Sequence, residues 1–255
     1  MLRNSFAVRS AALAVLFPGQ PELSRDRNIL FYDEVTKGGL DLPEFSQAGN
    51  QVILSSRRVG VPPSQTKVSV DHLGQHLRFL FVDDFPRQAF SLVQQNADSA
   101  WEAFKHVWPD ERLGGPAVLT EVTIRLTAAS EGNNATKFLV EKTLHLPPKA
   151  LAHLGRGVQG VGLRLMLPVQ FDPRSAFPLQ GADGNLSVET LLEDQSKLYF
   201  EFTAKWPSIA VPPQLVAQGA PAQLNVESKN PSEYLDMAYN YLVGPITDFL
   251  VEASV

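Results

Sequence analysis

Three glycines in the segment LGRGVQG have the spacing of a dinucleotide-binding loop, because Gly155, Gly157 and Gly160 spell G-x-G-x-x-G. In such loops a strand precedes the glycines and a helix follows, since amides at the helix N-terminus hold the pyrophosphate. Here PPKALAH before the glycines favours a short helix, and VGLRLMLPVQF after them alternates as a strand does. The order is inverted, and Asp183, at the distance of a ribose-binding acid, lies in the turn-like QGADGN. We therefore predict an ordinary connection and no cofactor.

His72 and His76 are four residues apart, the spacing at which a helix can present two metal ligands. They flank Gly74 in a stretch that is typical of a hairpin turn, where this offset does not guarantee one face. Asp71 is the nearby carboxylate. We predict histidines of a surface turn and no metal site. The other histidines are scattered: His106, His145 and His153.

Two pairs of adjacent acids, Asp83–Asp84 and Glu193–Asp194, could serve acid–base chemistry or hold a hard cation. Adjacent strand residues point to opposite faces, however, and an acid before a helix more often caps it. The chain has no G-x-S-x-G motif and no cysteine, which removes disulfides, thiolate zinc sites and cysteine nucleophiles. We assign no catalytic residue and favour a non-catalytic protein, while an enzyme assembled from distant residues stays open.

The composition is that of a folded globular protein: 255 residues, 44% hydrophobic and 19% charged, with a net charge of -5. No apolar run reaches the ~18 residues of a membrane span, and the absence of cysteine fits the cytoplasm. The negative net charge disfavours nucleic-acid binding. That alternative would require six arginines to lie on one face of the molecule. These are Arg57 and Arg58 with Arg3, Arg9, Arg25 and Arg27.

Apolar periodicity predicts a first half of strands followed by a helix. Alternation indicates strands at about 5–17, 51–59 and 66–82, the last divided by a hairpin turn at Gly74. A wide apolar stripe then predicts a helix over 89–108 that ends before Pro109. We expect this helix to lie across a sheet face with Trp101 and Trp108 buried.

The second half repeats this arrangement. The pattern predicts a hairpin of 117–129 with 137–146 across SEGNNAT, a strand at 161–171 and a hairpin over 185–206 around Glu193–Asp194. A helix over 231–251 begins after Asn230, a favourable cap, and Gly244–Pro245 should kink or break it. The fold class is α+β, with a largely antiparallel sheet in two similar halves, each closed by a helix. The halves are 1–112 and 113–255, as two domains or one continuous domain.

Two helix motifs carry a resemblance to a known family. The first is Trp101-Glu102-x-Phe104, and the second is Leu235, Ala238 and Tyr239 followed by Phe249. With the N-terminal strand, they resemble a widespread, sporadically distributed bacterial family of unknown function and similar length. The resemblance spans most of the chain and implies this two-half fold, but no activity.

These features favour an interaction or assembly protein, an adaptor whose partner is another protein or a second copy. The 117–146 hairpin would offer a sheet edge for strand pairing. The proline-rich segment 207–224 is a second predicted contact. The alternative is a small-molecule-binding protein or hydrolase with a pocket between the halves. Its first candidate residues would be His72, His76, Asp83 and Asp84.

Overall fold

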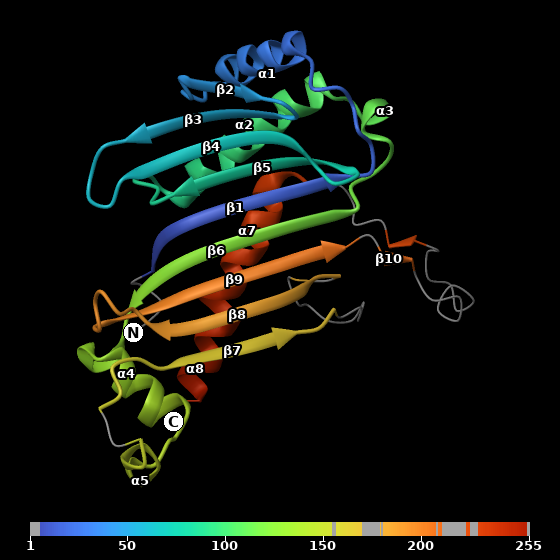
Figure 1. Cartoon of the computed structure of the whole chain (residues 1–255). Helices are drawn as coiled ribbons and strands as arrows, with labels where there is room; N and C mark the ends of the chain where they lie inside the picture. Colours follow the sequence, from blue (N-terminus) through green and yellow to red (C-terminus); the bar gives the residue numbers. More distant parts are fainter. Residues whose placement is uncertain are drawn as a thin grey trace.

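The computed structural model describes residues 6–154, 157–169, 179, 181–207, 209–210, 223–224 and 229–253. Nine of its strands form one antiparallel sheet in the order β2-β3-β4-β5-β1-β6-β9-β8-β7 (Figure 1). In chain order these strands are β1 (Ala7–Phe17), β2 (Glu44–Ala48), β3 (Gln51–Arg58), β4 (Ser64–Leu73), β5 (His76–Asp84), β6 (Leu119–Ala129), β7 (Gly162–Leu167), β8 (Asp183–Thr190) and β9 (Lys197–Pro207). A separate two-stranded ribbon joins β10 (Ile209–Ala210) to β11 (Gln223–Leu224).

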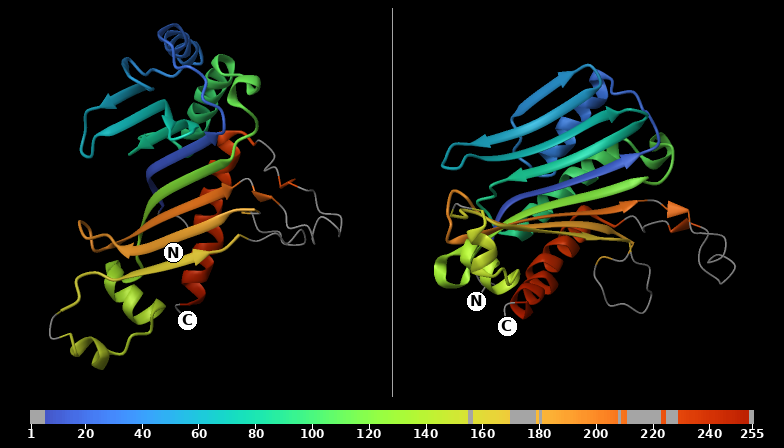
Figure 2. Two further views of the ribbon diagram at one scale, coloured as in Figure 1. Left: turned by 45° about the vertical axis from the view of Figure 1, so that its right-hand side comes forward. Right: turned by 60° about the horizontal axis from the view of Figure 1, so that its bottom comes forward.

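The sheet consists of two halves with the same strand order. β1 and β6 pair with each other in the middle; β5, β4 and β3 follow β1 outward, and β9, β8 and β7 follow β6. A long helix follows the last strand of each half: α2 (Phe90–Val107) after β5, and α7 (Pro231–Tyr241) after β9. Both helices cover the same face of the sheet (Figures 1 and 2). The predicted class, α+β with two similar halves each closed by a helix, is confirmed.

The two faces of the sheet differ in chemistry, as strict alternation requires. Leu13, Phe79, Ile124 and Phe202 are fully buried on the helix-covered face. The opposite face carries polar cross-strand pairs. Three of these join Arg78 to Asp71 (2.6 Å), Arg125 to Glu201 (2.8 Å) and Lys205 to Glu121 (3.1 Å).

One predicted strand is a helix. Residues 137–146 do not pair with β6; instead α4 (Ala135–Lys137) leads into a π-helical segment, η3 (Phe138–Thr143). The Asn134 side chain caps this turn by accepting from the Lys137 amide at 2.8 Å, and Leu139 is fully buried. The predicted 117–146 hairpin is therefore wrong. Its first strand, β6, lies in the sheet centre between β1 and β9 and offers no edge.

The remaining helices complete the helix-covered side and the ends of the sheet. α1 (Arg25–Lys37), which was not predicted from the sequence, buries Phe31 and Val35. Beyond α7 the chain does not break at Gly244–Pro245 but continues through a π-helical segment, η4 (Leu242–Ile246), into α8 (Thr247–Glu252). The short elements are α3 (Asp110–Leu113), η2 (Glu131–Asn133) and α5 (Pro148–Ala152). None of the helices in the described ranges is long and apolar enough to cross a membrane.

Candidate functional site

The two histidines of the β4–β5 hairpin do not converge. His72 stands opposite Leu77 in the register and His76 opposite Leu73, so their side chains leave opposite faces of the sheet. The His72 ring nitrogen Nε2 lies 3.1 Å from the carbonyl oxygen of Pro21. Among the residues that the structure describes, no group of three or more His, Asp or Glu could hold a metal ion.

Asp83 and Asp84 also project to opposite faces. Asp84 accepts a hydrogen bond from the Ser10 hydroxyl at 2.6 Å. Asp83 is 1% exposed on the helix-covered side, where burial raises its pKa to about 6 against the opposing effect of Arg58. Neither acid caps α2, whose N-cap is Ala89, so that prediction is wrong. Both acids lie at the opposite end of β5 from His76, seven and eight residues along the strand, which is about 23 to 26 Å.

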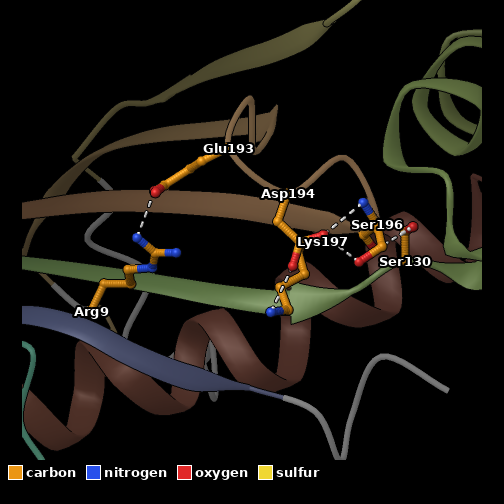
Figure 3. Close-up of polar contacts among 6 residues, drawn as sticks. All are labelled: Arg9, Ser130, Glu193, Asp194, Ser196 and Lys197. Carbon is orange, nitrogen blue, oxygen red and sulfur yellow. Dashed lines mark hydrogen bonds and ion pairs between the residues drawn. The ribbon is translucent and has the colours of Figure 1, made fainter. Parts of the chain in front are cut away.

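The acids of the β8–β9 hairpin hold the turn together (Figure 3). Asp194 accepts from the Ser196 hydroxyl at 2.6 Å and pairs with the Lys197 amine at 2.8 Å. These hydrogen bonds lower the pKa of Asp194 to about 2. Glu193 points the other way and pairs with Arg9 of β1 at 2.8 Å, which ties the hairpin to the first half (Figure 3).

The other sequence motifs are dispersed as well. α5 precedes the glycine segment and β7 follows it, in the inverted order that was predicted; Gly155 lies outside the described residues. Asp183 is not in a turn but opens β8, opposite Lys205. Most of the proline-rich segment 207–224 lies outside the described residues.

The arginines do not form one face. Arg57 and Arg58 end β3, near the start of β1, whereas Arg25 and Arg27 open α1, which follows the opposite end of β1. Arg3 lies outside the described residues.

A cavity between the two closing helices is the strongest candidate site. It has a volume of about 370 Å³ and lies over the middle of the sheet, between α2 and α7. This volume is at the small end of the about 300–1,000 Å³ range of ligand pockets. Strand residues form its floor and helix residues its walls. The apolar and aromatic lining consists of Leu13, Val15, Phe17, Trp101, Trp206 and Tyr234.

The aromatic rings of this lining are fixed by their neighbours. Trp101 of α2 stacks on Phe17 of β1 with ring centroids 6.0 Å apart and meets Phe79 edge-on at 5.4 Å. On the other wall, Tyr234 of α7 packs on Trp206 of β9 at 4.9 Å. One half of the molecule therefore supplies the first wall and the second half supplies the other.

Charged groups stand at the mouth. The Lys105 amine lies 5.8 Å from the Phe17 ring centroid and 5.7 Å from that of Trp101, and it forms an ion pair with Asp110 of α3. Burial against these rings lowers the pKa of Lys105, which Glu102 and Glu111 partly offset. Lys229 also borders the cavity, and its amine is 3.9 Å from Glu233. Burial raises the pKa of the Tyr234 hydroxyl.

Polar contacts between the halves hold the two walls in place. The Asp98 carboxylate of α2 accepts from the Ser232 amide in the first turn of α7 at 2.9 Å. Glu233 completes that turn by accepting from the Asn230 amide at 3.1 Å, a capping box. At the start of α2 and near the end of α7, Phe90 stacks on Tyr239 at 4.4 Å. The spacing of α2 and α7 is thus fixed by specific contacts on one side of the cavity.

The sequence signal for this site was present but ambiguous. Trp101 and Trp108 were both predicted to be buried; Trp108 is fully buried, whereas Trp101 is half-buried and lines the cavity. An apolar stripe identifies the inner face of a helix but does not show which of its residues border a void. The lining offers a flat apolar surface together with the Tyr234 phenol, the Thr120 hydroxyl, the Asp110 carboxylate and the amines of Lys105 and Lys229. This arrangement can bind a small apolar molecule.

No protein-family model and no curated protein matches the chain. Two solved structures are similar over most of their length. One is DynU16, from the dynemicin biosynthetic locus, at 10% identity over 96% of this chain and 98% of that chain, with a TM-score of 0.24. The other is the di-domain ARO/CYC StfQ from the steffimycin biosynthetic pathway, at 11% identity over 95% and 96%, with a TM-score of 0.21. Likeness at this level carries no functional conclusion, and the family resemblance stays a prediction.

Proposed function

We propose that the protein binds a small, flat, apolar molecule in the cavity between α2 and α7. The observation that carries the proposal is the cavity itself, about 370 Å³ with Trp101 on one wall and Tyr234 on the other. Ligand sites are typically concave and aromatic-lined and often lie where two parts of a fold meet, so a cavity of this kind at the junction of the two halves favours a ligand. The proposal is binding alone, because His72, His76, Asp83 and Asp84 do not meet in the described structure.

A neutral fluorescent probe tests this function. N-phenyl-1-naphthylamine is flat, apolar and uncharged, and its emission rises when it leaves water. We expect saturable binding of one probe per chain, together with quenching of tryptophan emission, because Trp101 and Trp206 line the cavity. Absence of saturable binding would overturn the proposal.

A blocking variant locates the probe. Ala117 is half-buried and borders the cavity, so Ala117→Phe should place a ring in the cavity and weaken probe binding about tenfold or more. The matched control is Ala152→Phe, the same change on the exposed α5, which should leave binding unchanged. Equal affinity in both variants would place the probe elsewhere and contradict the proposal.

The adaptor function remains a second candidate. It now depends on the edge strand β7 and not on the 117–146 hairpin that the sequence predicted. β7 is one of the two outer strands of the nine-stranded sheet, β2 being the other, and the Met166 side chain of β7 is 79% exposed. An outer strand with an exposed apolar side chain can pair with a strand of another chain. If the protein dimerises there, a native mass spectrum should show a dimer that Met166→Glu reduces to monomer. A dimer unchanged by this substitution would exclude β7 as the contact.

A further inference from the structure

We infer that the ligand of this cavity is an amphipathic anion, a flat apolar body with one carboxylate-like group that pairs with Lys105. The inference rests on the proposed function and adds the chemical class of the ligand. The Lys105 amine borders the cavity and lies within 6 Å of two ring centroids, those of Phe17 and Trp101. An ammonium group held among apolar rings has lost part of its hydration, so an anion that reaches it gains more than it would in water.

The present partner of Lys105 is placed to be exchanged. Asp110 belongs to the four-residue helix α3, and its side chain is 74% exposed, whereas that of Lys105 is 27% exposed. An exposed carboxylate loses little when it returns to water. Asp110 itself lines the cavity, so a ligand anion would take its place beside Lys105 without disturbing the core.

The other charged residues near the Lys105 amine do not form an ion pair with it as Asp110 does. Glu102 and Glu111 raise the pKa of Lys105 only against the larger effect of burial. Lys229 also lines the cavity and is 3.9 Å from Glu233, so the charged residues of the lining are two amines and the Asp110 carboxylate. Once a ligand displaces Asp110, the charged groups left in the lining are two amines, which favour an anion over a neutral ligand of the same shape.

Two probes that differ by one charged group test the inference. 8-Anilinonaphthalene-1-sulfonate is the sulfonated form of N-phenyl-1-naphthylamine, so the ratio of their dissociation constants isolates the contribution of the anion. We expect the wild type to bind the sulfonate more tightly, with an affinity that falls as salt rises. In Lys105→Met the sulfonate should weaken about tenfold, while the neutral probe changes less than about twofold.

Two further variants test whether the ligand anion displaces Asp110 and whether the effect is specific to Lys105. Asp110→Asn leaves the fold intact because the side chain is exposed, and it should tighten the sulfonate several-fold without affecting the neutral probe. Lys37→Met removes a lysine of α1 that pairs with Glu34 outside the cavity, and it should change neither affinity. Equal effects of Lys105→Met on both probes, or no effect of Asp110→Asn on the sulfonate, would overturn the anion inference. Failure of both probes to bind the wild type would instead overturn the proposed function.

Discussion

The two halves of the molecule close equivalent corners, at opposite ends of the antiparallel sheet, with different chemistry. Just after β1, Gly19 accepts from the Leu77 amide of β5 at 3.1 Å and donates to the Leu113 carbonyl at 2.7 Å. Just after β6, Ser130 uses both its amide (2.9 Å) and its hydroxyl (2.8 Å) to donate to the Ser196 carbonyl. The first corner depends on close contact between main chains, and the second on a side chain.

The two halves also differ in the environment of an acidic residue near the last strand of each. Asp83 at the end of β5 is buried, and its pKa is raised to about 6. Asp194 in the turn before β9 is solvated and hydrogen-bonded, and its pKa is lowered to about 2. Strand pairing uses backbone groups that almost any sequence supplies, so the pairing order can repeat while side-chain chemistry diverges. This explains how two halves can share a topology with thin sequence identity.

The largest expected effect comes from Gly19→Ala. A Cβ at this position would lie 2.5 Å from the carbonyl carbon and oxygen of Leu113, a clash with main chain that no rotamer relieves. We expect the variant to lose about 3 kcal/mol of unfolding free energy in urea denaturation, and to widen the neighbouring cavity, whose edge includes Gly115.

Gly244→Ala is the matched control, because a Cβ there meets nothing within 4 Å. It should leave stability unchanged or raise it by less than about 1 kcal/mol. Equal stability of Gly19→Ala and Gly244→Ala would show that the first corner is not closed by main-chain contact.

The next effect comes from Asp83→Asn. Because the folded pKa of about 6 exceeds the ordinary value of 3.8, folding disfavours the charged form. Stability from this group is present in full below about pH 3.8 and is lost as the pH rises through about 6. The amide stays neutral, so the variant should be more stable than the wild type by about 1–3 kcal/mol at pH 8.

Measuring the unfolding free energy of Asp83→Asn and of the wild type against pH shows whether the buried charge causes the difference. The gain over the wild type should shrink between pH 6 and the ordinary pKa of 3.8, where both side chains are neutral. A variant that is less stable than the wild type at pH 8 would mean that the carboxylate makes a necessary ion pair with Arg58.

A smaller loss is expected for Ser130→Ala at the second corner. The hydroxyl bond to the Ser196 carbonyl disappears, but the Ser130 amide still donates to the same oxygen at 2.9 Å. Unfolding free energy should fall by about 1 kcal/mol, well below the loss in Gly19→Ala. If Ser130→Ala proved the more damaging substitution, the comparison of the two corners would be reversed.

Much of the fold could be predicted because period-two alternation is a local signal. β3, the β4–β5 hairpin, the β8–β9 hairpin and α2 all lie where alternation or an apolar stripe placed them. The segment KFLVEKTLHL failed because its residues have high strand propensity, while a cap at Asn134 and burial of Leu139 select a helix. Tertiary packing overrode local preference there.

The candidate site could not be predicted from the same signals. Leu13, Trp101 and Tyr234 are separated by long stretches of chain, and each looks like an ordinary core residue. They surround a cavity because β1 lies beneath the space between α2 and α7, which depends on how the two halves join. The two members of each polar pair, His72 and His76 or Asp83 and Asp84, lie on opposite faces of the sheet and form no common site.

The smallest effect, and the one opposite in sign to Asp83→Asn, is expected for Asp194→Asn. Because Lys197 and Ser196 lower the pKa of Asp194 to about 2, stability from this carboxylate is present above about pH 3.8 and is lost as the pH falls through about 2. The variant should therefore be slightly less stable than the wild type at pH 7, by less than Asp83→Asn gains at pH 8, since solvent screens an exposed pair. High salt should shrink the difference. A salt-independent loss would instead point to the Ser196 hydrogen bonds, and a gain in stability would contradict the turn's dependence on this charge.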